Sequence, residues 1–149
     1  MAIARGAGTE IIRSVHLETI SSSAEEVIIG VQHHIYTVLS IIVAAAHVNT
    51  AGNFIRCYLQ AYDSLSGESG QVINIFQQDM NVNETFVWND KFSFMGTEPT
   101  DFTAGLDSVA KQDAIADQAT TTAQKLYLVG EHASDIFDVT CTYIDQNNA

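Results

Sequence analysis

The chain has 149 residues, a length typical of one domain with room for a substantial hydrophobic core. Apolar residues make up 46% and charged residues only 16%, so we expect most of the chain to fold. Its 6 Lys and Arg against 18 Asp and Glu give a net charge of −12, which argues against direct binding to nucleic acid or to an anionic membrane surface. The first residues lack the apolar stretch of a signal peptide, so we expect no export by that route.

Alternation of apolar and polar residues predicts a chain of short strands. Residues 1–10 lack this pattern, and we expect them to form a flexible N-terminal arm before a single domain at 11–149. The last strand shows the alternation best, because one of its faces carries Phe137, Val139, Cys141 and Tyr143. Strands are expected at about 11–20, 26–31, 34–44, 53–62, 71–77, 84–88, 91–95, 124–130 and 135–145.

The run His34–Val43 is apolar on both faces, with Tyr36, Val38 and Ile42 assigned to one of them. Such a strand is either covered on both sides or presents one face to a partner chain. We therefore count Tyr36 and Val38 among the candidate contacts. Further along, Asn89-Asp90 predicts a tight hairpin turn between the strands at 84–88 and 91–95.

Residues 97–123 break the strand pattern with a long segment rich in Ala, Asp, Gln and Thr. A helix over about 108–119 and a loop both remain open for this insertion. Its expected role is contact with a neighbouring subunit, as for the N-terminal arm. The candidate contact residues of the arm and the insertion are Ile3, Arg5, Phe102, Leu106, Val109 and Ile115.

These elements predict an all-β protein, an antiparallel β-sandwich of jelly-roll or immunoglobulin-like type, with the insertion near 97–123 either part-helical or a loop. A parallel sheet is disfavoured because no helices separate the strands in the first two thirds of the chain.

No pattern in the sequence predicts catalysis. The two cysteines, Cys57 and Cys141, fall on inward faces and are expected to be buried free thiols, with a disulfide between two packed sheets as the alternative. The adjacent His33 and His34 would point to opposite faces of a strand, and no metal-binding spacing is present. We therefore expect no metal, no cofactor and no enzymatic activity.

Four aromatic residues gather around the predicted hairpin: Phe86, Trp88, Phe92 and Phe94. Aromatic residues at strand spacing favour core packing, while a carbohydrate-binding platform is the alternative.

The order of strands resembles that of small β-sandwich virion proteins of tailed bacteriophages. The resemblance covers about residues 10–146. It rests on the apolar run I-Y-T-V-L-S-I-I-V, the strand F-I-R-C-Y-L-Q-A-Y, the segment E-T-F-V-W-N-D-K-F-S-F and the closing pair of strands K-L-Y-L-V-G and D-I-F-D-V-T-C-T-Y-I. The insertion at 97–123 departs from it, because those proteins usually have a short turn there.

This resemblance implies a non-enzymatic capsid decoration or cement protein, located in the virion and assembled in the host cytoplasm. It also implies a homo-oligomer, with a trimer favoured, that binds the major capsid protein or other virion proteins. The alternatives are a neck, tail or fibre component, or a carbohydrate-binding module.

Overall fold

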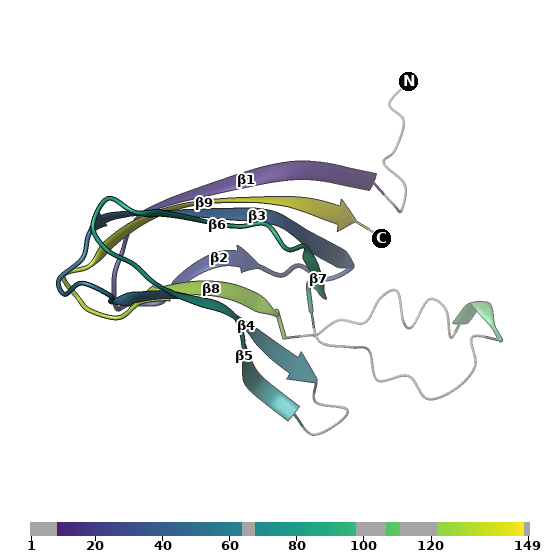
Figure 1. Ribbon diagram of the computed structural model, residues 1–149. Coiled ribbons are helices and arrows are strands. Elements are labelled where there is room, and N and C mark those ends of the chain that lie inside the picture. Colours follow the sequence, from purple (N-terminus) through teal and green to yellow (C-terminus); the bar gives the residue numbers. More distant parts are fainter. Residues whose placement is uncertain (1–8, 64–67, 98–106, 111–121, 148–149) are drawn as a thin grey trace.

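In the computed structural model the described residues are 9–63, 68–97, 107–110 and 122–147. They form two antiparallel sheets that pack face to face, which confirms the predicted all-β sandwich (Figure 1). The strands are β1 (Thr9–Ile20), β2 (Glu25–Ile29), β3 (His34–His47), β4 (Phe54–Asp63), β5 (Glu68–Asp79), β6 (Thr85–Trp88), β7 (Phe92–Met95), β8 (Lys125–Gly130) and β9 (Ile136–Asn147).

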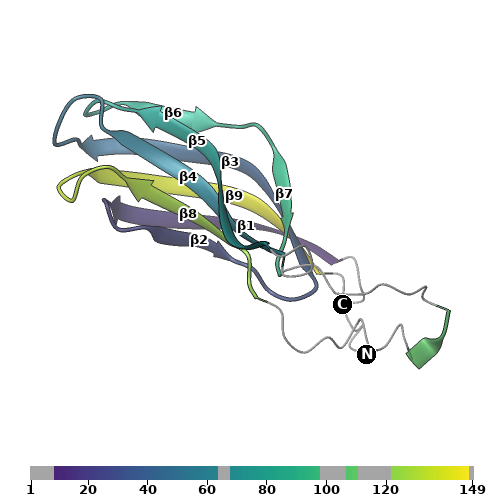
Figure 2. The same ribbon diagram turned by 90° about the horizontal axis from the view of Figure 1, so that it is seen from below.

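Sheet A has the order β1-β9-β3-β6, with β7 also paired to β3, and sheet B has the order β2-β8-β4-β5. Seen from below, sheet B lies in front of sheet A, with β2 over β1, β8 over β9, β4 over β3 and β5 over β6 (Figure 2). The last two strands thus lie inside the two sheets, between strands formed much earlier in the chain. Of the two sandwich types expected from the sequence, this Greek-key order is that of a jelly roll.

The core lies between the sheets and is built from the inward residues of each alternating strand. Cys57 of β4 and Cys141 of β9 are completely buried there, and both are free, as the sequence predicted. Burial raises the pKa of the Cys141 thiol to about 12 and that of Cys57 further still. Neither sulfur is therefore a ready nucleophile in the folded chain.

A β-bulge in β3 corrects the predicted faces of this strand. The register with β9 shifts between Val38 and Ser40, so the side chain alternation changes phase at Leu39. Tyr36 and Val38 consequently lie in the core, 3% and 0% exposed, whereas Ile42 points outward. Placing all three on one face was wrong, because a strict period of two does not anticipate the extra residue.

The predicted hairpin around Asn89-Asp90 is also wrong. β6 pairs with Ile41–Ala44 and β7 pairs with Ile35–Val38, so both follow the same neighbour, β3, instead of pairing with each other. Together they occupy one edge position of sheet A. β3 is long enough to accept two short partners in succession, which local turn chemistry cannot reveal.

The four aromatic residues of β6 and β7 face the core, as the core-packing interpretation predicted. With Phe76 of β5 they close the open side of the sandwich between β5 and β6. Successive ring centroids lie 5.2 to 6.2 Å apart, the spacing of favourable aromatic pairs. The carbohydrate platform considered for these residues is therefore not formed at this position.

The insertion leaves the sandwich at a tightly packed base. Thr97 and Ala123 form an isolated antiparallel bridge, and the Gln124 side chain donates to the carbonyls of Met95 and Thr97 at 3.1 Å. Next to this base, a Cβ on Gly30 would lie only 1.8 Å from the Gly96 carbonyl oxygen. Glycine is therefore required where the two backbones cross.

Only residues 107–110 of the insertion interior are described, so most of the helix considered for 108–119 lies outside the described residues. Val109 and Ala110 have helical backbone, and Val109 is 71% exposed.

Candidate functional site

The free edges of the sheets are the largest unpartnered features of the described chain. β1 pairs with β9 from Thr9 to Leu17 and then at Ile20, and it has no strand on its other side. β5 pairs with β4 and likewise ends its sheet. Both strands have 12 residues, so each presents a long row of backbone groups that another strand could pair with.

The β5 edge lacks most of the features that normally protect an edge strand. Its residues 71–78 read Q-V-I-N-I-F-Q-Q, with no charged residue and no proline. Val72 and Ile73 are 55% and 53% exposed. Edges of monomeric proteins are usually blocked by lysine, proline or very short strands, and of these β5 has none. A bulge at Ile75 is its only irregularity within this stretch.

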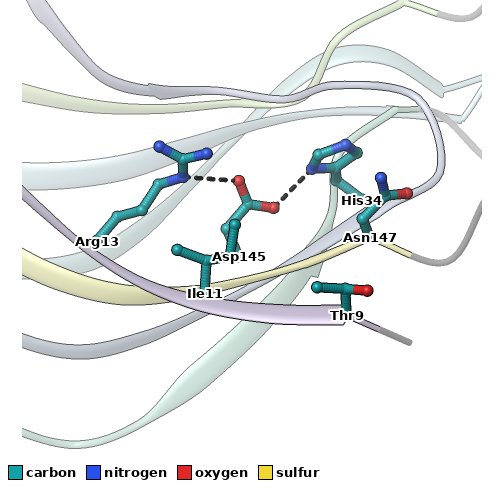
Figure 3. A pocket seen from close by; sticks show the side chains of 6 residues that line it. All are labelled: Thr9, Ile11, Arg13, His34, Asp145 and Asn147. Atoms are coloured by element: carbon teal, nitrogen blue, oxygen red, sulfur yellow. Dashed lines mark hydrogen bonds and ion pairs between the residues drawn. The ribbon is translucent and has the colours of Figure 1, made fainter. Parts of the chain in front are cut away.

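A cluster of charged side chains lies at the end of sheet A that is nearest the insertion. The Arg13 guanidinium donates to Asp145 at 3.0 Å, and His34 Nδ1 donates to the other carboxylate oxygen at 2.6 Å (Figure 3). The three residues come from β1, β9 and β3, so the cluster links three neighbouring strands. A cavity of about 180 Å³ adjoins them, lined also by Thr9, Ile11 and Asn147.

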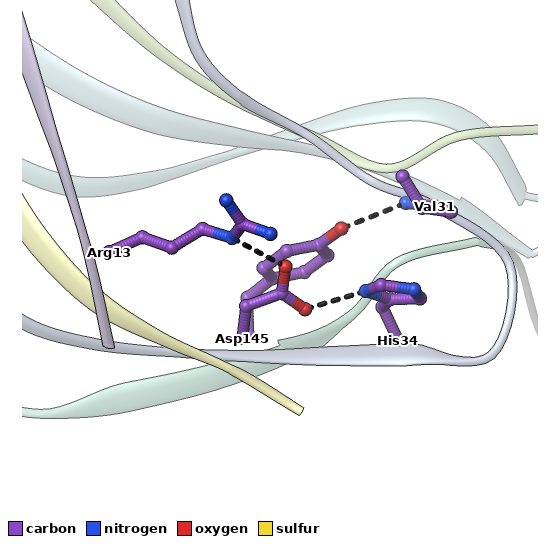
Figure 4. A network of polar contacts seen from close by, with 5 residues as sticks. Arg13, Val31, His34 and Asp145 are labelled. Atoms are coloured by element: carbon purple, nitrogen blue, oxygen red, sulfur yellow. Dashed lines mark hydrogen bonds and ion pairs between the residues drawn. The ribbon is translucent and has the colours of Figure 1, made fainter. Parts of the chain in front are cut away.

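Tyr36 extends this cluster toward sheet B. Its hydroxyl accepts a hydrogen bond of 3.1 Å from the Val31 backbone N–H (Figure 4). Burial and then the nearby Asp145 carboxylate raise the pKa of Tyr36 to about 12. This phenol therefore stays neutral at physiological pH. The cluster fits a structural role, because each oxygen of its one carboxylate is held by a basic side chain.

Among the residues that the structure describes, no group of three or more His, Cys, Asp or Glu side chains is placed to hold a metal ion. Within the same residues, no helix is both long enough and apolar enough to cross a membrane.

The structure brings few of the predicted contact residues together. Tyr36 and Val38 lie in the core and cannot reach a partner in the folded chain. Val109 is exposed on the insertion. The other five candidates, which are Ile3, Arg5, Phe102, Leu106 and Ile115, lie outside the described residues.

Two features escaped the sequence interpretation. The charged cluster could have been predicted in part from the sequence, because Arg13 and Asp145 both occupy inward positions in alternating strands and carry opposite charges. The free edges could not have been predicted from the sequence, because the position of a strand in its sheet depends on pairing between distant segments.

Comparison with known proteins does not identify a function for this chain. No family model matches the chain, and no curated protein matches it. A solved structure from work on Bacillus endospore appendages, described as a novel family of disulfide-linked pili, matches with a TM-score of 0.45 and 11% identity. The match covers 100% of this chain and 97% of the other. At that TM-score and identity, the likeness does not by itself assign a function.

The expectation of a bacteriophage virion protein is nevertheless corrected. The structural likeness reported above is to a spore appendage and not to a virion protein. The capsid decoration or cement role, the capsid partner and the virion location were therefore wrong. The underlying resemblance was one of strand order, which many unrelated β-sandwiches share.

Proposed function

We propose that this chain is a non-enzymatic structural subunit that joins copies of itself through the free edges of β1 and β5, as a component of a fibre. The observation that carries the proposal is the presence of two 12-residue strands, each ending a different sheet, without proline or lysine in either. A strand pair formed across copies would satisfy the backbone groups that both edges leave open.

The placement of the edges supports an extended assembly. β1 lies on one side of the sandwich and β5 on the other, so a copy can use both at once (Figure 2). Pairing β1 of one copy with β5 of the next is a head-to-tail contact, which continues into a filament unless the rotation closes a ring. Pairing of like edges would instead give a two-fold dimer.

The assembly we propose is non-covalent. The name of the matched appendages refers to disulfide links, but the only two cysteines of this chain are buried and free. A disulfide between folded copies would require one of these thiols to leave the core.

The insertion is proposed as an additional contact between copies. Val109 is an exposed apolar residue on it, and Thr97 and Ala123 at the two ends of the insertion are bridged to each other. The candidates Ile3, Arg5, Phe102, Leu106 and Ile115 belong to the same proposal.

The edge contact is tested by placing a lysine on β5. In Val72→Lys the new charge should block strand pairing, so the protein should shift from filaments or oligomers to monomers in light scattering and electron microscopy. Val82→Lys is the matched control, because Val82 is 51% exposed but lies in the turn after β5. A wild-type protein that stays monomeric at high concentration, or a Val72→Lys protein that assembles normally, would refute the proposal.

A further inference from the structure

The two long sides of the sandwich differ in how they are closed. On the side of β5 and β6, the row of aromatic rings closes the space between the sheets. On the opposite side, β1 and β2 end their sheets (Figure 2). Here a cavity of about 370 Å³ is lined by residues of both sheets, and it shares Arg13, His34 and Asp145 with the smaller cavity described above. Sites for small molecules have volumes of about 300 to 1,000 Å³, so this cavity is large enough for a small ligand.

Three side chains that line this cavity carry hydrogen-bond donors without an acceptor among the described residues. The Tyr36 hydroxyl accepts from the Val31 N–H, and no described residue accepts its own proton. The hydroxyl of Tyr143 likewise has no partner in the described chain, although Tyr143 is only 8% exposed. Arg13 donates to Asp145 through Nε alone, so both of its Nη groups remain available. Because buried hydroxyls are normally paired, the cavity is suited to a ligand that supplies acceptors.

Both hydroxyls are donors at physiological pH. Burial is the main cause that raises the pKa of Tyr143, as it is for Tyr36, so neither phenol ionises there. The charge of Arg13 opposes this rise of the pKa in both tyrosines, because the guanidinium lies near each hydroxyl. The three donors therefore lie in the same part of the cavity.

The two acids that line the cavity are already paired with bases. Asp145 is held by Arg13 and His34, and Glu26 pairs with Lys125 at 2.8 Å. Asp145 thereby fixes the position of the guanidinium and leaves its Nη groups for a ligand. The other negative charges of the protein act weakly here, since charges are screened beyond about 8 Å at physiological ionic strength.

The wall of the cavity on the side of β2 is apolar. It is formed by Val27, Ile28, Ile29 and Val31. A hydrocarbon chain of a few carbon atoms would be removed from water against this wall. The cavity thus has a polar end that offers donors and an apolar end.

We infer that this cavity binds a small aliphatic carboxylate, with its charged group on Arg13 and the two tyrosine hydroxyls and its chain against β2. The parallel N–H groups of a guanidinium match the two oxygens of a carboxylate, and such charge-assisted hydrogen bonds are stronger than those between neutral groups. This binding goes beyond the proposed function and does not depend on it.

The test is a titration of the protein with sodium butyrate, followed by two-dimensional NMR at constant sodium concentration. Butyramide is the matched ligand, because it has the same shape and carries no charge. We expect butyrate to shift the resonances of the residues that line the cavity. Butyramide should bind at least about tenfold more weakly, because it lacks the charge that strengthens the hydrogen bonds.

Substitutions locate the binding site. Tyr143→Phe removes one donor and keeps the ring, so it should weaken butyrate binding at least about fivefold. Tyr58→Phe is the matched control, because Tyr58 lies in β4 and stacks on Tyr127, outside the cavity, and it should bind butyrate like the wild type. Arg13→Gln should cause the largest loss. The Tyr143→Phe variant decides the question if Arg13→Gln does not fold, since the hydroxyl it removes has no partner in the described chain.

Three results would overturn the inference. The first is the absence of butyrate-dependent shifts up to about 50 mM, which excludes a dissociation constant below that concentration. The second is equal affinity for butyrate and butyramide, and the third is equal affinity of the Tyr143→Phe and Tyr58→Phe proteins for butyrate.

The same titration on the Val72→Lys protein separates this failure from that of the proposed function. Butyrate binding by a protein that never forms filaments would remove the proposed function and leave the cavity site standing. Filaments that Val72→Lys abolishes, without butyrate binding by either protein, would do the reverse.

Discussion

Two buried aspartates, one at each end of β9, hold the two ends of the sandwich by different chemistry. Asp135 is 1% exposed and accepts from the backbone N–H groups of Asn49 and His132 and from the Asn53 side chain amide, at 2.8 to 3.2 Å. All of its described partners are neutral. Asp145 is 7% exposed and is held instead by Arg13 and His34.

Asp135 stabilises the end where it lies through hydrogen bonds to neutral groups, whereas Asp145 stabilises the other end through interactions between charges. Asp135 fixes two loops, those after β3 and β8, by satisfying backbone donors that would otherwise be buried without a partner. Asp145 joins three strands through charges, and Arg13 is half exposed to solvent. Salt should therefore act on the Asp145 end and largely spare the Asp135 end.

The largest expected effect follows from Asp135→Ala. It removes the acceptor for three groups at once, so the free energy of unfolding should fall by about 3 to 4 kcal/mol. Urea denaturation measures this change. Asp138→Ala is the control on the same strand, because its carboxylate accepts an exposed bond from the Thr19 N–H, and it should cost less than about 1 kcal/mol. An equal fall in the free energy of unfolding in the two variants would show that the hydrogen bonds to Asp135 are not specially stabilising.

Alkaline pH should weaken the Asp145 end next. The folded chain keeps Tyr36 neutral up to a pKa of about 12, whereas the unfolded chain ionises it near 10. The stabilisation that Tyr36 contributes through its raised pKa is therefore complete below pH 10 and is lost as pH rises toward 12. The free energy of unfolding should fall over this range by up to about 2 to 3 kcal/mol. Denaturation at pH 8 to 12 should show a shallower decline for Tyr36→Phe than for the wild type. Identical slopes would show that this phenol does not couple to folding.

Loss of the ion pair should have a smaller effect. Arg13→Gln leaves Asp145 with His34 alone, and the half-exposed guanidinium limits the loss to about 1 to 2 kcal/mol at low salt. The loss should shrink as sodium chloride is raised, while the loss in Asp135→Ala stays constant. A salt-independent Arg13→Gln effect would indicate that packing of the arginine, and not its charge, matters.

The smallest effect is expected from replacing residues 99–121 with a short Gly-Ser turn. Because the Thr97–Ala123 bridge and the Gln124 clamp remain, stability should change by less than about 1 kcal/mol. Assembly should nevertheless weaken if the insertion is a contact between copies. Thermal melts and light scattering on the same sample measure the two effects separately, and an unchanged oligomer would exclude the insertion from the interface.

The positions of the strands followed from the sequence because a half-buried strand records its burial in every second residue. Thus β9 was predicted at 135–145 and is found at Ile136–Asn147. The bulge at Leu39 was not predictable, because it alters the phase within a run that is apolar at nearly every position. Tyr36 and Val38 were misplaced for that reason.

The candidate site was predictable only in part. Val109 was named from the sequence as a contact residue, and it is exposed. The strands that end each sheet are instead set by pairings between residues that are far apart in the chain, such as Thr9 and Asn147. No local pattern distinguishes a central strand from an edge strand when both alternate. The assembly surfaces proposed here therefore depend on the three-dimensional arrangement.

The central placement of β8 and β9 governs the order in which the protein can fold. These strands are made last, yet β9 separates β1 from β3 and β8 separates β2 from β4. A nascent chain that has reached only the insertion lacks the middle of both sheets, and the strands already made expose unpaired backbone. The β1–β9, β3–β9, β2–β8 and β4–β8 pairings thus wait for β8 and β9, whereas β4–β5 and the pairings of β3 with β6 and β7 can form earlier, so completion of the two sheets should be slow. Until β8 and β9 arrive, the exposed edges are sites where a chaperone or another nascent chain can bind.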